Sequence, residues 1–280
     1  MTSQTVERYE GTWRRLANIS ASRKGSIHDD DAARGMGFRG GFVPGSTVGQ
    51  AAMPAIIARL GPQWMEGGWY SFKFVRPVYV DEEVREVGAE LLADGTLPLQ
   101  VEARDGRLCC DGAAGLGTTV PWDVSEDGTH GADEVFPAMT IGDAFAPGEL
   151  HVVAEEVAAM IAAAGDPTPW YESESPWGDP IIPPERLMNA ALNHIRGEIL
   201  TDDRVRNPGM WAEHSITMAQ PVFAGRTYTL TEHLADKGRS GRTAYVDYQF
   251  EIVDEAGAPC ATGRHKIKWI LQSEQPGDKD

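Results

Sequence analysis

The sequence has few cysteines, no long hydrophobic run and no metal-ligand spacing among its histidines and cysteines. Three cysteines among 280 residues cannot form a disulfide framework. The longest apolar run, Val157–Ala164, is far shorter than the roughly 20 residues of a transmembrane helix. The first residues lack the basic start and apolar core of a signal peptide. We therefore expect a reduced, cytoplasmic protein with no metal site and no cofactor.

Positive charge is also scarce. Lysine and arginine number 25 against 42 aspartates and glutamates, which gives a formal net charge of −17. Such a chain repels the phosphates of nucleic acids and of anionic lipid surfaces, so we expect neither a nucleic acid nor a membrane as partner. Hydrophobic residues make up 41% of the chain, enough for a folded core rather than a disordered chain.

The chain divides near its middle. Residues 121–139 (PWDVSEDGTHGADEVFPAM) are polar, contain glycine and proline and have no hydrophobic period, as is typical of a linker. The sequence thus predicts an N-terminal domain over residues 1–120 and a C-terminal domain over 140–280.

The two sides of this linker repeat each other. An apolar segment opens a helix at about Thr47 in the first half and at about Glu185 in the second. The offset between matched residues grows from 139 to 144 to 150, as expected when length changes lie in loops. The matched residues are Pro44 with Pro183, Ala51-Ala52 with Ala190-Ala191, Pro77 with Pro221, and Cys110 with Cys260.

Each half reads as a helix followed by strands. Residues Thr243–Val253 alternate between apolar and polar, the period of a strand with one buried face. Hairpin-length turns at Asp94-Gly95, Asp105-Gly106, Lys237–Gly241 and Glu255–Gly257 predict antiparallel pairing. The helix after Thr47 is apolar over most of its surface and needs cover nearly all round. We therefore predict an α+β fold in which a curled antiparallel sheet wraps a central helix, twice.

Two segments carry a family resemblance. IHDDDAARGMGFRGGFVPG, in the first half, resembles the signature of the MaoC-like R-specific enoyl-CoA hydratases and dehydratases, with its histidine and its glycine-rich approach to the central helix. The segment from residue 141 to 187 resembles the start of a MaoC-like domain. The resemblance implies a double hotdog fold, with two tandem hotdog domains, and chemistry on acyl thioesters.

In that family an aspartate and a histidine activate water, and a glycine N–H at the start of the central helix binds the thioester oxygen. Such a site pairs a general base with preorganised donors for an enolate. In the first half the resemblance assigns the histidine to His28 and the glycine to Gly45. The aspartate position holds Arg23 instead. The resemblance therefore implies His28 and Gly45 as catalytic residues.

The second half departs from the pattern differently. Asp166 matches the aspartate, but Tyr171 stands at the histidine position and Pro184 at the glycine position. Proline has no N–H to donate. We therefore interpret Asp166 and Tyr171 as the remnant of a lost site, and expect the working site in the first half.

Two further residues are candidates for binding substrate. Arg23 can bind a substrate carboxylate or a coenzyme A phosphate, and as a nearby cation it lowers the pKa of His28. Asp29, Asp30 and Asp31 are candidates to replace the missing acid, of which at most one can reach the site, and Asp30 is the one we assign to substrate binding. All three aspartates also suit the cap of a helix beginning at Ala32.

The resemblance predicts a hydro-lyase that hydrates or dehydrates a 3-hydroxyacyl or enoyl thioester of coenzyme A or an acyl carrier, or a variant elimination or isomerisation through the same enolate. Two alternatives stay open: a hotdog acyl-CoA thioesterase and a non-catalytic acyl-binding protein. Gln50 and Asn189 stand where hotdog thioesterases often carry a carboxylate, which disfavours hydrolysis. Two fused hotdogs form a pseudo-dimer, so the chain is predicted to be a monomer or a homodimer.

Overall fold

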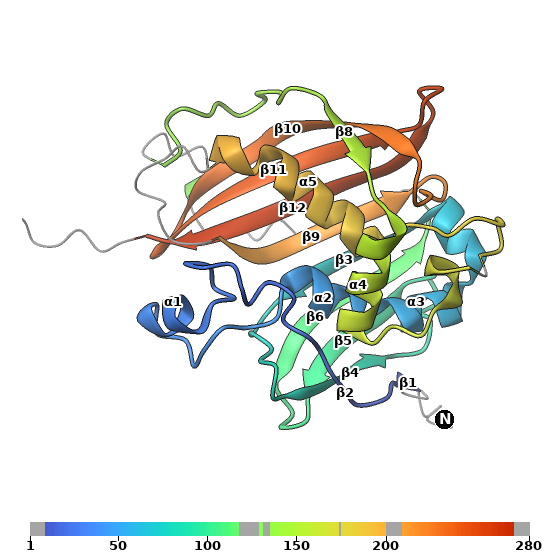
Figure 1. Ribbon diagram of the computed structural model, residues 1–280, viewed down its shortest axis with the longest axis horizontal. Helices are drawn as coiled ribbons and strands as arrows, with labels where there is room; N and C mark the ends of the chain where they lie inside the picture. Colours follow the sequence, from blue (N-terminus) through green and yellow to red (C-terminus); the bar gives the residue numbers. More distant parts are fainter. Residues whose placement is uncertain (1–8, 118–128, 131–134, 174, 200–208, 272–280) are drawn as a thin grey trace, which may run out of the picture.

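The computed structural model describes residues 9–117, 129–130, 135–173, 175–199 and 209–271. Its strands form one twelve-stranded antiparallel sheet, with helices along the concave face (Figure 1). The strands are β1 (Tyr9–Glu10), β2 (Arg14–Arg15), β3 (Gly68–Phe74), β4 (Glu83–Gly88), β5 (Leu97–Ala103), β6 (Leu108–Leu116), β7 (Thr129–His130), β8 (Gly148–His151), β9 (Met210–Met218), β10 (Thr227–Ser240), β11 (Thr243–Val253) and β12 (Pro259–Ile270). The helices are α1 (Asp30–Gly35), α2 (Gly45–Gln50), α3 (Met53–Leu60), α4 (Ala154–Ala164) and α5 (Pro184–Ile199), with short 3₁₀ turns at Pro62–Glu66 and Pro169–Tyr171.

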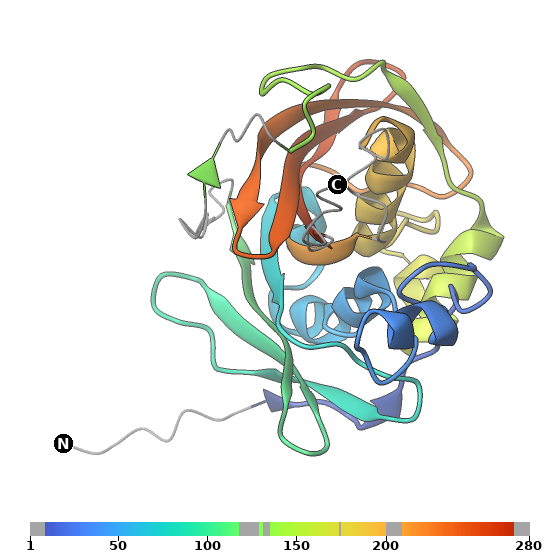
Figure 2. The ribbon, with the colours of Figure 1, turned by 90° about the vertical axis from the view of Figure 1, so that its left-hand side faces the viewer.

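The sheet has twofold pseudosymmetry. Its central order is β4-β5-β6-β3 followed by β9-β12-β11-β10, so the second half mirrors the first in chain order. The halves join where β3 pairs with β9, and there Ser71 lies opposite Ser215. These two serines are 144 positions apart, one of the offsets of the repeat, so they stand at the symmetry axis. Viewed from the side, the sheet curls around the helices of both halves (Figure 2).

Equivalent hydrogen bonds confirm the predicted duplication. The N–H of Val43 donates to the carbonyl of Val78 at 2.8 Å, and the N–H of Ile182 donates to that of Val222 at 2.6 Å. Each of the four matched prolines stands next to one of these residues. The two helices that follow begin at equivalent residues, Gly45 and Pro184, close to the predicted starts.

The cysteine match is wrong by one residue. The carbonyl of Cys109 accepts from the N–H of Val75, and the carbonyl of Cys260 accepts from that of Ala219. Cys260 is therefore the equivalent of Cys109, not of Cys110. Adjacent identical residues gave the sequence comparison no means of choosing between them, whereas the hydrogen bonds of the ladder fix the register.

The central helix of the first half is broken in two. Pro54 has no N–H and its ring clashes with the carbonyl four residues earlier, that of Gln50, so α2 ends there and α3 begins after a turn. Arg14 binds two helix ends: its guanidinium donates to the carbonyl of Ala51 and, through Nε at 3.0 Å, to that of Ala164 at the end of α4. A cation suits the carbonyl end of a helix.

The predicted strand pattern is confirmed in β11. Its apolar face is buried in the core that the sheet forms with the helices. The turns at Asp94-Gly95, Asp105-Gly106 and Glu255–Gly257 lie between paired strands. The turn predicted at Lys237–Gly241 is wrong over most of its length, because β10 continues to Ser240.

Most of the predicted linker, residues 121–128 and 131–134, lies outside the described residues. Of the remainder, β7 pairs with β10, and Val135, Phe136 and Met139 are buried in the core. The boundaries of the two domains stay a prediction. In the ranges the structure describes, no helix is both long enough and apolar enough to cross a bilayer.

Candidate active site between the two lobes

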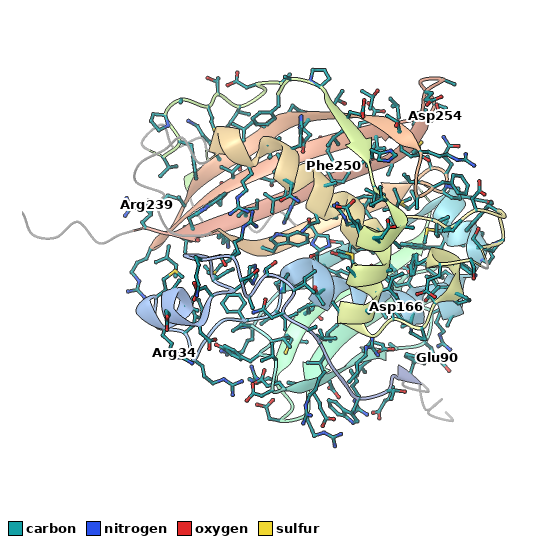
Figure 3. All side chains as sticks on the ribbon, in the orientation of Figure 1. Arg34, Glu90, Asp166, Arg239, Phe250 and Asp254 are labelled. Carbon is teal, nitrogen blue, oxygen red and sulfur yellow. The ribbon has the colours of Figure 1, made fainter. Side chains whose placement is uncertain are left out.

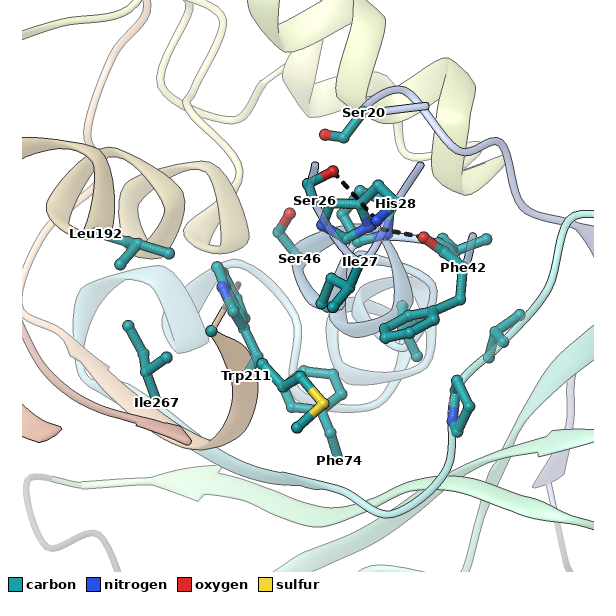
Figure 4. Close-up of a pocket in the computed structure, with 18 of the residues that line it drawn as sticks. Ser20, Ser26, Ile27, His28, Phe42, Ser46, Phe74, Leu192, Trp211 and Ile267 are labelled. Carbon is teal, nitrogen blue, oxygen red and sulfur yellow. Dashed lines mark hydrogen bonds between the residues drawn. The ribbon is translucent and has the colours of Figure 1, made fainter. Parts of the chain in front are cut away.

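A cavity of about 380 Å³ lies where the start of α2 faces α5 and β9. His28, Phe42 and Ser46 of the first half line it, together with Leu192, Trp211 and Ile267 of the second (Figure 4). No acidic side chain is among the described residues that line the cavity. The site is thus built from both halves of the chain, and its titratable groups are a histidine and arginines.

The loop before α1 holds His28 at the cavity. Its main-chain N–H donates to Ser26 Oγ at 3.2 Å, and Ser26 Oγ in turn donates to the carbonyl of Arg23 at 2.7 Å. The carbonyl of His28 accepts from the Asn18 side chain at 2.9 Å. These bonds fix the backbone on both sides of the imidazole, which brings Arg23 and His28 to the same cavity wall.

The ring of His28 has a defined tautomer. Its Nδ1 lies 2.7 Å from the carbonyl oxygen of Phe42. A carbonyl only accepts, so Nδ1 carries the hydrogen and Nε2 holds a lone pair. Nε2 has no hydrogen-bond partner among the residues that the structure describes. A neutral imidazole held in this way is suited to accept a proton.

Burial lowers the pKa of His28 below its usual value of 6.5, and the charges of Arg23 and Arg196 lower it further. The hydrogen bond to Phe42 acts in the opposite direction and is smaller than the burial effect. The imidazole is therefore neutral at pH 7. The predicted influence of Arg23 on this group agrees with the structure in sign, although burial is the main cause.

Asp30 lies outside the cavity. Its Oδ1 accepts from the N–H of Gly41 at 2.8 Å, and its other oxygen pairs with Arg34 at 3.2 Å. Arg34 lies at the outer edge of the molecule (Figure 3). Gly41 passes so close to the main chain of His28 that a Cβ there would lie 2.3 Å from the His28 carbonyl oxygen. Asp30 thus holds the segment that carries the Phe42 carbonyl, and it is not among the residues that line the cavity.

The aspartates around Asp30 confirm the capping interpretation. Asp29 is the N-cap of α1, and its side chain accepts from the N–H of Asp31. The helix begins at Asp30, two residues before the predicted start, with acidic residues in its first turn.

Gly45 begins α2 at the cavity wall. Main-chain N–H groups at the first turn of a helix have no acceptor within the helix, and no described residue accepts from the N–H of Gly45 or of Ser46. Trp211 packs directly on Gly45: a Cβ there would lie 2.9 Å from the Trp211 Cβ. The residue at position 45 must therefore be small. The N–H groups of Gly45 and Ser46 are available to an oxygen in the cavity.

One face of α5 completes the cavity from the second half. Asn189, Leu192, Asn193 and Arg196 all line it, and their spacing of three or four residues places them on one side of the helix. Arg196 of this face and Arg23 of the loop before α1 line the same cavity. Neither guanidinium has an ion pair with any residue that the structure describes. The sequence pointed to Asn189 on this face but not to Asn193 or Arg196, although these polar residues recur at helical spacing within a helix predicted to be central.

In the second half, a tyrosine occupies the position equivalent to His28. The N–H of Phe42 donates to the carbonyl of Ile27, and the N–H of Ile181 donates to that of Trp170. This equivalence confirms that Tyr171 stands at the place of His28.

There, Asp166 accepts from the Gln50 side chain at 2.7 Å, and Asp166, Tyr171 and Gln50 are all buried. Asp166 lies between the two halves, just after α4 (Figure 3). Burial raises the pKa of Asp166 and the pKa of Tyr171. Asp166, Tyr171 and Gln50 form a closed polar cluster, and none of them lines the cavity described above.

Solved structures resemble this arrangement over nearly the whole chain. A protein named as a MaoC domain dehydratase from Chloroflexus aurantiacus superposes with a TM-score of 0.65 at 11% identity, covering 96% of each chain. A conserved protein of Mycobacterium tuberculosis, described as a double hotdog, gives 0.61 at 13% identity, over 94% of this chain and 96% of the other. This chain has the double hotdog fold.

The likeness is one of structure alone. No family model and no curated protein sequence matches the chain. A protein named as an oleoyl thioesterase from Lactobacillus plantarum also shares the double hotdog fold, with a TM-score of 0.50 at 10% identity over 96% of this chain and 99% of that one. The double hotdog is thus found in proteins named for different reactions, so the reaction must be argued from the site.

Proposed function

We propose that this double hotdog is a lyase of the MaoC-like type, which adds water to an enoyl thioester or removes it from a 3-hydroxyacyl thioester. The thioester is carried by coenzyme A or by an acyl carrier. The observation that carries the proposal is the placement of His28, a neutral imidazole, and the unbonded N–H of Gly45 in the wall of one cavity. A cytoplasmic location stays a prediction from the sequence.

In the dehydration direction, Nε2 of His28 removes a proton from C2 of the thioester. The electron pair of the C2–H bond moves toward the thioester carbonyl, whose oxygen gains negative charge and accepts from the N–H of Gly45. As the carbonyl re-forms, the bond from C3 to its hydroxyl breaks, and the leaving oxygen takes the proton from the imidazolium to depart as water. Hydration is the same sequence reversed.

The absence of a carboxylate from the described cavity wall gives this site a single base. One imidazole can serve as both base and acid, because it accepts a proton in the first step and returns it in the second. The same group also suits a variant elimination or a double-bond isomerisation, which pass through the same enolate. Hydrolysis is favoured less, because Asn189 stands where a thioesterase would hold a carboxylate and Gln50 is bonded to Asp166.

The direct test mixes the purified protein with crotonyl-CoA and follows the absorbance of the enoyl thioester band together with free thiol. Loss of the enoyl band without thiol release supports the lyase. Release of free thiol without hydration of the double bond would establish the thioesterase instead. Binding of the thioester with no chemical change in either direction, tested also with 3-hydroxybutyryl-CoA and 3-butenoyl-CoA, would establish a non-catalytic acyl-binding protein.

The pH dependence should report the lowered pKa of His28. As the base, His28 must be neutral, so kcat/KM should fall as pH drops through a value below 6.5 and stay level above it. Replacing Arg23 by Gln removes a charge that lowers this pKa, so the acid limb should move to higher pH. Arg76→Gln is the control, because Arg76 lines the same cavity but is not among the groups that shift His28. If the acid limb of kcat/KM does not move in the Arg23 variant, the assignment of that limb to His28 is contradicted.

A further inference from the structure

Two unpaired guanidiniums stand beside the candidate base. Arg23 comes from the loop of the first half and Arg196 from α5 of the second, and both line the cavity with His28. They are close enough for the charge of Arg23 to lower the pKa of Arg196, after burial, which is the larger cause. Like charges placed together without a counter-ion are unfavourable. In a chain with 42 acidic residues, Arg196 is half-buried and Arg23 is exposed, whereas the other half-buried arginines of the described part all have a carboxylate partner.

The position of the pair decides which anion fits. The carbonyl of Arg23 accepts from the Ser26 hydroxyl, which in turn accepts from the main-chain N–H of His28, so the backbone of Arg23 is tied to the backbone of His28. The charges of Arg23 and Arg196 both reach the imidazole. An anion bound by this pair therefore lies in the same cavity as the imidazole.

The phosphates of coenzyme A do not suit this position. At the roughly 3.5 Å that an extended amide unit spans, the two amide units of the pantetheine arm and their flanking methylenes hold the phosphates more than about 10 Å from the thioester. Arg76 is the better candidate for a phosphate, because it lines the same cavity but, unlike Arg23 and Arg196, is not among the charges that lower the pKa of His28. The pair beside His28 is left for a charge on the acyl group itself.

We propose that Arg23 and Arg196 together bind a carboxylate carried by the acyl group, so that the substrate is the thioester of a dicarboxylic acid. This inference rests on the proposed function for its reaction and adds the substrate class. The planar guanidinium fits a carboxylate through paired hydrogen bonds. The two arginines come from opposite halves, so one carboxylate held between them also fixes the acyl chain across the start of α2.

The test compares thioesters that differ only in the terminal group. Fumaryl-CoA is measured against crotonyl-CoA, and glutaconyl-CoA against trans-2-pentenoyl-CoA, at pH 8, where His28 is neutral in every variant. The wild type should prefer the carboxylate-bearing member of at least one pair in kcat/KM. Arg23→Gln and Arg196→Gln should each reduce that preference about 10- to 100-fold, the usual worth of a hydrogen bond between charged groups.

Arg76→Gln is the matched control. It should leave the carboxylate preference unchanged, even if it changes kcat/KM for both thioesters of a pair by the same factor. The proposal is overturned if the wild type prefers neither carboxylate, or if Arg23→Gln and Arg196→Gln weaken both members of a pair alike. Loss of preference in the Arg76 variant as well would overturn it too, because the effect would then be a diffuse field and not a site.

A binding experiment separates this inference from the reaction. Calorimetry with glutaryl-CoA and valeryl-CoA, which are saturated and cannot be hydrated, measures the carboxylate preference without chemistry. Tighter binding of glutaryl-CoA that is lost in the Arg23 and Arg196 variants supports the carboxylate site even if no thioester is hydrated. Equal binding of the two, in a protein that does hydrate crotonyl-CoA, rejects the carboxylate site and leaves the lyase standing.

Discussion

Replacing His28 by Ala should lower kcat for hydration by about 10²–10⁴, the usual contribution of a positioned general base or acid. No other titratable side chain in the described cavity wall is neutral at pH 7, because the rest are arginines. No carboxylate in that wall can take over the proton transfer. The measurement is single-substrate kinetics with the most active enoyl thioester, at a pH above 7.

Two controls keep the result specific. His151→Ala removes an exposed histidine on β8 that is not among the residues lining the cavity, and should leave kcat unchanged. Added imidazole should restore part of the activity of the His28 variant, since it can enter the space that the side chain leaves. The variant loses the hydrogen bond to Phe42, so its unfolding in urea must be compared with that of the wild type. A folded His28→Ala protein with kcat within a few-fold of wild type would place the base elsewhere.

The sequence was sufficient for the fold because neither of its signals depends on knowing which strands pair. Alternation along residues such as Thr243–Val253 gives strands, and the repeat of proline positions gives two copies. It failed where a choice depended on pairing. Cys109 and Cys110 are chemically the same, and only the hydrogen bonds of the sheet show which one matches Cys260. The break in the central helix could have been seen, because Pro54 stands inside the segment.

The site was predicted only in part because it is shared between the halves. His28, Gly45 and Arg23 lie within 23 positions of one another, and a motif can bring such residues together. Arg196 and Trp211 come from the other half. The polar residues of α5 recur at helical spacing, but that spacing does not show that they face a cavity which the first half begins. Asp30 is the reverse case. It stands inside the motif, but the cap of α1 turns it to the N–H of Gly41.

The start of α2 allows a second strong prediction, in which a single N–H donor is removed and the added carbons are matched in a control variant. Gly45→Pro deletes the N–H that we assign to the thioester oxygen. Proline is tolerated at the first position of a helix, and Pro184 occupies the equivalent position of α5. Because any Cβ at this position meets Trp211, Gly45→Ala is the matched comparison: it adds the same Cβ but keeps the N–H.

We expect Gly45→Pro to have a kcat/KM about 10²–10³ below that of Gly45→Ala, the effect of losing one oxyanion donor. Both variants should be somewhat destabilised by crowding at Trp211, and comparing them cancels that cost. The two should bind a saturated acyl-CoA with similar affinity, because the missing bond matters most when the oxygen carries negative charge. Equal activity of the two variants would show that the N–H of Gly45 does not hold the enolate, and would leave the neighbouring N–H of Ser46 as the donor to test.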